Sequence, residues 1–205
     1  MKLAVFCGSA SGDIPIYTEA AYAFGKLAAR RGIGLVYGGG HVGLMGAVAD
    51  GALAAGGEVT GIMPTALAEK EIAHTGLTRL EVVPDMHTRK TRMAELASGF
   101  VTLPGGAGTL EEIFEQWTWA QLGLHQKPCG FLNVAGYFDP LFEMIERTVS
   151  AGFMKRDYAE MLVCTVDPDT LLERFARYRP PAQKWQSKSA EIKAQCMLEN
   201  QNNGS

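Results

Sequence analysis

A short glycine-rich segment, Pro104-Gly105-Gly106-Ala107-Gly108-Thr109, constrains the fold of this chain more than any other stretch. The apolar run at residues 99–103 precedes it, and the amphipathic run at residues 110–122 follows it. A strand, a glycine-rich turn and a helix in this order form the phosphate-binding unit of open α/β folds. Because three glycines lack a Cβ atom, the backbone can turn tightly and its N–H groups can approach an anion.

The spacing of these glycines differs from two well-known nucleotide motifs. Gly105 and Gly106 are adjacent, which does not fit G-x-G-x-x-G, and no Lys-Ser or Lys-Thr pair follows Gly108 as in the Walker motif. The natural interpretation is therefore neither a dinucleotide cofactor nor ATP hydrolysis. A structural alternative also fits: a tight strand-to-helix turn with a capping carboxylate, Glu112, in the first turn of the helix, which Thr109 can also cap. A carboxylate beside a bound phosphate is unfavourable, so at a phosphate site Glu112 should have a task, and Thr109 could donate its hydroxyl to the phosphate.

Apolar and amphipathic runs alternate along the chain, which predicts strands alternating with helices. The expected strands are the apolar runs at residues 3–7, 34–37, 58–63, 78–83, 100–103, 129–134 and 161–166. The expected helices are the periodic runs at residues 15–31, 44–55, 85–98, 110–122, 138–151 and 168–178. This order predicts a single α/β domain over residues 1–180, a doubly wound, mostly parallel sheet of about seven strands with helices on both faces. Residues 181–205 are polar and follow Pro180-Pro181, so we expect a flexible tail.

Three other stretches follow predicted strands at the carboxyl edge of this sheet, where open α/β folds bind ligands. Gly8-Ser9 ends the first strand, and a second glycine-rich turn, Gly38 to Gly46, ends the next. Asp85 is a suitable N-cap for the helix at residues 85–98. In the first turn of that helix Arg89 and Lys90 oppose the helix dipole, which favours a bound anion, although a solvated basic turn fits equally well.

The segment at residues 65–77 shows no clear periodicity and contains Glu71 and His74. We expect a solvated loop there. His41, in the second glycine-rich turn, is likewise more typical of a solvated loop histidine than of a ligand contact.

The composition excludes several classes of function. A net charge of −3 argues against a broad nucleic-acid surface. The four cysteines are scattered, with no C-x-x-C pair and no histidine at metal-ligand spacing, which predicts buried thiols in a reducing cytoplasm and neither a ligand cluster nor a metal. The apolar start is too short for a signal peptide, and no run is long enough to span a membrane.

Two motifs together identify a family resemblance. Pro104-Gly105-Gly106-x-Gly108-Thr109-x-x-Glu112, preceded by Asp85-Met86-His87-x-Arg89-Lys90, resembles the LONELY GUY (LOG) family of cytokinin riboside 5′-monophosphate phosphoribohydrolases, long mislabelled as lysine decarboxylases. The resemblance covers residues 2–178 and includes the stretches at residues 37–40, 43–46 and 118–123. Ala107 stands where many members carry Tyr, which we take as permitted variation.

The resemblance implies a Rossmann-like fold, a homodimer, no cofactor, and hydrolysis of the N-glycosidic bond of adenosine 5′-monophosphate (AMP), often N6-prenylated. The products are the free base and ribose 5-phosphate. Its catalytic residues fall on Arg89 and Glu112. Its implied substrate contacts, with those expected from the glycine-rich stretches, are Gly8, Ser9, Gly39, Gly40, Gly43, Met45, Glu71, Met86, Lys90, Pro104, Gly105, Gly106, Gly108, Thr109 and Thr118.

The chemistry of such a cleavage suits a carboxylate near C1′. Breaking a ribosyl C–N bond develops positive charge on the sugar, which Glu112 can stabilise while it activates a water molecule. Arg89 can either hold the phosphate or orient Glu112, and the residues leave both roles open. A carrier that binds a nucleotide or molybdenum cofactor without turnover is the main alternative, but binding alone does not need Glu112. A lysine decarboxylase would need pyridoxal phosphate on a lysine in a much larger chain.

Overall fold

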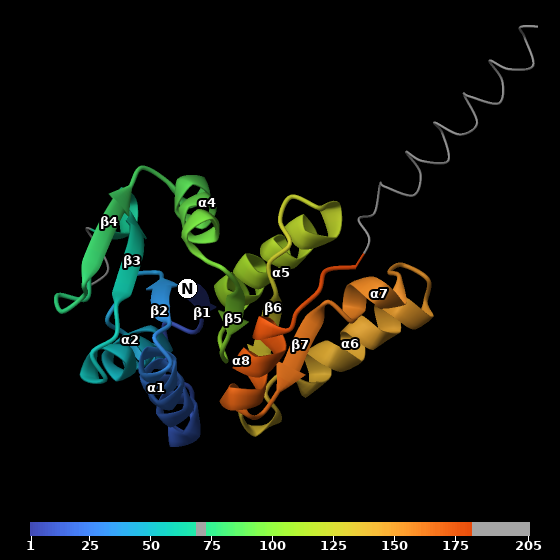
Figure 1. The fold of residues 1–205 in the computed structure, drawn as a ribbon, viewed down its shortest axis with the longest axis horizontal. Coiled ribbons are helices and arrows are strands. Elements are labelled where there is room, and N and C mark those ends of the chain that lie inside the picture. Colours follow the sequence, from blue (N-terminus) through green and yellow to red (C-terminus); the bar gives the residue numbers. More distant parts are fainter. Residues whose placement is uncertain (69–72, 182–205) are drawn as a thin grey trace, which may run out of the picture.

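A seven-stranded parallel sheet forms the centre of the computed structural model, which describes residues 1–68 and 73–181 (Figure 1). Its strands are β1 Lys2–Phe6, β2 Gly34–Tyr37, β3 Val59–Pro64, β4 Arg79–Val83, β5 Phe100–Thr102, β6 Cys129–Leu132 and β7 Leu162–Thr165. The helices are α1 Pro15–Arg30, α2 Gly43–Ala54, α3 Thr65–Ala68, α4 Met86–Leu96, α5 Ala107–Leu122, the 3-10 turn η1 Val134–Gly136, α6 Asp139–Ser150, α7 Arg156–Ala159 and α8 Pro168–Ala176. The predicted fold class is confirmed.

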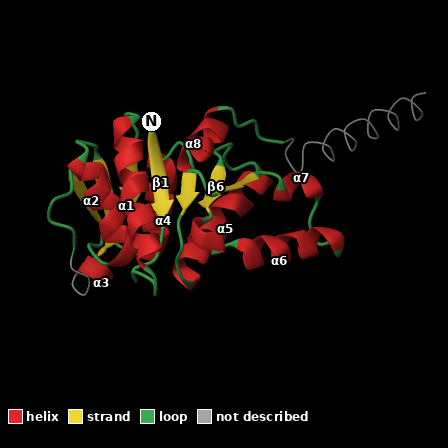
Figure 2. Cartoon of the chain, turned by 90° about the horizontal axis from the view of Figure 1, so that it is seen from below, coloured by secondary structure: helices red, strands yellow, loops and turns green. Residues whose placement is uncertain are grey.

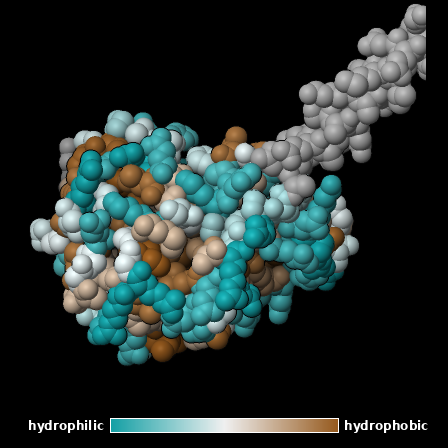
Figure 3. Space-filling model, in the orientation of Figure 1, coloured by the Kyte–Doolittle hydropathy of each residue, from teal (hydrophilic) through white to brown (hydrophobic). Residues whose placement is uncertain are grey.

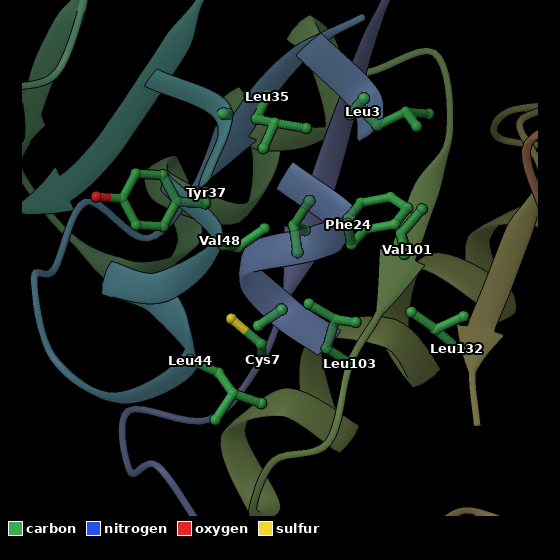
Figure 4. Close-up of a cluster of buried hydrophobic side chains, with 14 of the residues drawn as sticks. Leu3, Cys7, Phe24, Leu35, Tyr37, Leu44, Val48, Val101, Leu103 and Leu132 are labelled. Atoms are coloured by element: carbon green, nitrogen blue, oxygen red, sulfur yellow. The ribbon is translucent and has the colours of Figure 1, made fainter. Parts of the chain in front are cut away.

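The strands are continuous apolar runs because the central ones are buried on both faces. Along β1 and the residue after it, Leu3, Val5 and Cys7 point to one hydrophobic core, whereas Ala4 and Phe6 point to the other. Figure 4 shows the first of these cores, where β1 and β2 side chains meet helix α1. Helices α1, α2 and α8 cover this face, and α4, α5, α6 and α7 cover the opposite one (Figures 1 and 2).

The strand order, β4-β3-β2-β1-β5-β6-β7, places a topological switch point between β1 and β5. From β1 the chain winds outward to β4, and helix α4 then returns it to β5 on the other side of β1. The loops that leave β1 and β5 therefore diverge, and a crevice opens between them at the carboxyl edge. This is the place where open α/β folds bind ligands.

The prediction for residues 65–77 is wrong in part. Helix α3 forms at its start, Ala73 pairs with Gly40 in an isolated bridge, and His74 is buried with only 6% exposed. A hydrogen bond explains the burial of His74, since its ring contacts the Asp50 carboxylate from helix α2. Glu71 lies outside the described residues, as do residues 182–205 of the expected tail.

The surface carries mixed hydropathy. Hydrophilic residues cover most of the face in Figure 3, with hydrophobic side chains exposed between them in patches. None of the helices in the described part of the chain has the length and apolar character needed to cross a membrane.

Candidate active site

A cavity of about 370 Å³ lies at the switch point. The loop after β1, helix α4 and the start of α5 build it, with one residue from α2. Its lining residues are Cys7, Gly8, Ser9, Met45, Met86, Arg89, Gly106, Ala107, Gly108, Thr109, Glu111 and Glu112. The structure therefore brings together both predicted catalytic residues and most residues of the two motifs, although they come from distant parts of the sequence.

A second cavity of about 470 Å³ adjoins the first and shares Gly8, Ser9 and Gly106 with it. Pro104 and Gly105 line this second cavity, together with Tyr17 of α1 and Tyr137. The Tyr137 hydroxyl donates a 2.8 Å hydrogen bond to the carbonyl oxygen of Gly105. The glycine-rich loop thus forms the wall between the two cavities.

Backbone hydrogen bonds lock the three loops of the site together. Gly8 N donates to Pro104 O at 2.9 Å, and Leu44 N donates to Gly8 O at 3.1 Å. A Cβ atom on Gly105 would lie only 2.7 Å from Gly8 N and would also overlap the Thr109 side chain, so this close approach requires glycine.

Helix α5 presents an uncapped N-terminus to the cavity. Gly106 is its N-cap and offers no side-chain hydrogen bond, so the alternative in which Glu112 or Thr109 caps the helix is wrong. The first N–H groups of a helix have no intrahelical acceptor, and residues 107–109 at the start of α5 line the cavity. Backbone N–H groups in this position bind phosphate. Because the helix starts at Ala107, Glu112 lies in its second turn rather than its first.

Arg89 is buried, with 8% of its surface exposed, and faces the same cavity. The predicted N-cap of its helix is confirmed, since Asp85 accepts a 2.7 Å hydrogen bond from Thr88 N. Arg89 Nη1 contacts the Met86 sulfur at 3.6 Å, and Nη2 lies 3.9 Å from Glu112 Oε1. Within the described residues Arg89 Nε is buried without an acceptor. A guanidinium with so few close acceptors has donors available for an anion.

Glu112 is the most perturbed carboxyl group of the site. Burial raises the pKa of Glu112 to about 7, and the positive charge of Arg89 opposes this rise. Burial also raises the pKa of the neighbouring Cys7 thiol, with a smaller contribution from the Glu112 charge, so Cys7 stays a neutral thiol. The ionised and protonated forms of Glu112 are therefore both populated near neutral pH, as acid–base catalysis requires.

Several predicted contacts do not line the cavity. Lys90 Nζ instead donates to Glu111 Oε1 at 2.6 Å and to Glu115 Oε1 at 3.0 Å. Thr118 is exposed on α5, and its hydroxyl donates to Phe114 O at 2.7 Å. Gly39, Gly40 and Gly43 support the turn after β2 rather than the cavity wall. Their roles in binding, with that of Glu71, stay predictions.

One group in the described ranges 1–68 and 73–181 has the spacing of a metal site. The ligand atoms of His41, Asp50 and His74 lie within 4.8 Å of one another, so the prediction that no ligand cluster forms is wrong. Gly76 N donates to His74 Nδ1 at 3.0 Å, and His74 Nε2 lies 2.9 Å from Asp50 Oδ1. Because Nδ1 accepts from Gly76 N, the N–H lies on Nε2, which donates a hydrogen bond to Asp50 Oδ1. This arrangement is a hydrogen-bond network, and its residues do not line the Arg89–Glu112 cavity.

Fold and site together define a Rossmann-like α/β protein whose switch-point cavity is lined by a buried arginine and a carboxyl group. The family model described as "Possible lysine decarboxylase" matches residues 45–175. The chain is 43% identical over 187 residues to the probable cytokinin riboside 5′-monophosphate phosphoribohydrolase LOGL2 of Oryza sativa subsp. japonica, covering 91% of this chain and 77% of that protein. It is 44% identical over 179 residues to the phosphoribohydrolase LOG7 of Arabidopsis thaliana, covering 87% and 82%. The chain therefore belongs to the LOG family.

Solved structures share the fold at lower identity. The molybdenum cofactor binding protein of Rippkaea orientalis superposes with a TM-score of 0.64 and 20% identity, covering 86% of this chain and 95% of that one. The molybdenum cofactor carrier protein of Chlamydomonas reinhardtii gives a TM-score of 0.65 and 18% identity, covering 86% and 98%. At these identities the likeness establishes the fold alone.

Proposed function

We propose that this chain hydrolyses the N-glycosidic bond of AMP and its N6-substituted derivatives and releases the free base and ribose 5-phosphate. One observation supports this proposal most strongly: the buried Arg89 guanidinium and the Glu112 carboxyl group lie 3.9 Å apart in one cavity. The N-terminus of α5 opens into the same space. The names of the relatives above supply the substrate class.

In the proposed reaction, the 5′-phosphate binds to the N–H groups at the start of α5 and to Arg89. The ribose C1′ then lies beside Glu112, one helical turn further along. As the C–N bond breaks, its electron pair leaves with the base, and the Glu112 carboxylate stabilises the positive charge on the sugar. Water adds to C1′ and gives one proton to Glu112, while the departing base takes a proton from solvent. Glu112 then releases its proton to solvent, which restores the carboxylate.

We further propose a cytoplasmic homodimer with no nucleic-acid or membrane partner. The family resemblance implies the dimer, and Thr118, Leu122 and Leu124 are exposed toward the C-terminal end of α5, where they offer a contact surface to a second subunit. The buried free thiols of Cys7 and Cys129 support a reducing compartment. Size-exclusion chromatography with light scattering tests the dimer, and a monomeric mass at micromolar concentration would contradict it.

Product analysis tests the proposed activity. Purified protein is incubated with AMP or with N6-isopentenyladenosine monophosphate, and the free base and ribose 5-phosphate are measured by chromatography. We expect both products in equal amounts, and the preferred substrate identifies the physiological class. A carrier would bind the nucleotide and release no base, which would refute the proposal.

A further inference from the structure

Gly38, the first residue after β2, lies directly against the Arg89 guanidinium. A Cβ atom built on Gly38 would approach Arg89 Nη2 much closer than the 3.0 Å that real Cβ atoms keep, and would lie 3.3 Å from Arg89 Cζ and from Met45 Sδ. The space that Arg89 Nη2 occupies therefore exists only because Gly38 has no side chain.

The backbone of Gly38 does not explain the glycine. Its neighbour Gly39 has a φ of +87°, which disfavours other residues, but Gly38 is not among the residues with positive φ. Alanine would fit this backbone, and the atom that it would displace is the far end of a flexible side chain. Space for Arg89 is therefore the requirement at this position.

Packing rather than hydrogen bonding holds the guanidinium in place. Its nearest polar contacts in the described chain are the Met86 sulfur at 3.6 Å and Glu112 Oε1 at 3.9 Å. The atom that would meet a Cβ on Gly38 is Nη2, which is also the atom nearest Glu112. A change at Gly38 therefore alters the pair on which the site depends.

We propose that Gly38 is a positioning residue, whose missing side chain sets the place of the Arg89 guanidinium beside Glu112. The expected effect on turnover rests on the proposed function, whereas the expected position of the guanidinium does not depend on it. In Gly38→Ala the guanidinium moves by about 1 Å or more, a misplacement that typically costs on the order of 100-fold in rate. The fold survives, because one flexible side chain absorbs the overlap.

A double-mutant cycle separates this role from a general packing effect. In Arg89→Lys the terminal nitrogen reaches only the position of Arg89 Cζ, which an added Cβ on Gly38 clears at 3.3 Å. We expect Gly38→Ala to lower kcat/KM for AMP on the order of 100-fold in the native background and less than about 3-fold with Lys at position 89. Gly34→Ala is the matched control, since Gly34 begins β2, the strand that Gly38 follows, has no positive φ and faces the flexible Lys2 side chain.

The crystal structure of Gly38→Ala supplies a readout that does not depend on activity. A displaced Arg89 guanidinium in an otherwise unchanged fold supports the proposal even if AMP is not the substrate. An unmoved guanidinium, full activity of Gly38→Ala, or equal losses in the two backgrounds would each overturn it. Failure of the native protein to cleave AMP would refute the proposed function alone.

Discussion

Replacing Glu112 by Gln should stabilise the protein while it disables the site. Burial raises the pKa of Glu112 from 4.5 to about 7. At about 1.4 kcal/mol per pKa unit, the ionised side chain costs the fold about 3 kcal/mol. The native state binds this proton more tightly than the unfolded chain does. The free energy of unfolding therefore falls as the pH rises from about 4.5 to about 7 and stays lower above it.

Glutamine resembles the protonated carboxyl group at every pH. At about pH 8 the variant should gain up to ~3 kcal/mol, or roughly 6–12 °C in Tm for a chain of this size. Near pH 4.5 the difference should vanish. The same change should lower kcat on the order of 100-fold or more, because Gln neither takes a proton from water nor stabilises the cationic sugar. The KM for AMP should change much less, because the phosphate contacts remain.

Denaturant unfolding at the two pH values and steady-state kinetics with AMP measure both effects. Glu143→Gln, an exposed substitution on α6, is the control and should change neither quantity. A folded Glu112→Gln with normal kcat would reduce Glu112 to a structural carboxyl group and refute the reasoning. An equal stability difference at both pH values would refute the raised pKa.

Three further predictions follow from the structure and the sequence. The kcat/KM for AMP should fall about tenfold per pH unit below about pH 7, as the Glu112 carboxylate is protonated; a flat profile in buffered kinetics from about pH 5 to 8 would contradict this. His74→Ala should lower the free energy of unfolding by about 1–3 kcal/mol, since Asp50 and Gly76 N lose their buried partner; denaturant unfolding measures it, and a change below about 0.5 kcal/mol would argue against it. Deleting residues 186–205, a polar segment that follows Pro180-Pro181, should change neither Tm nor turnover, whereas a large fall in Tm would mean that it docks.

Strand positions were predictable because the apolar runs reflect burial on both sheet faces. Residues 34–37 form β2 as expected, since Leu35 and Val36 face opposite cores. The start of α4 was predictable too, because the side chain of Asp85 caps this helix. Helix α5 begins at Ala107, three residues before its amphipathic run, because Gly106 caps it without any side chain.

The two motifs predicted the members of the site but not their geometry. Arg89 and Glu112 approach each other only because α4 and α5 pack on the same face of the sheet. The burial that raises the Glu112 pKa depends on the same packing. Gly38 was missed because its signal is the space that it leaves for Arg89, and His74 because its partner Asp50 lies 24 residues away.

The requirement for a 5′-phosphate tests the central claim most directly. The Arg89 guanidinium and the α5 N-terminus are both explained by an anion, and binding energy from the phosphate can be used at the reacting C1′. We predict that the protein releases adenine from AMP and cleaves adenosine very poorly. The kcat/KM for adenosine should be lower than that for AMP by a factor on the order of 100 or more. Equal kcat/KM values for AMP and adenosine would contradict the account.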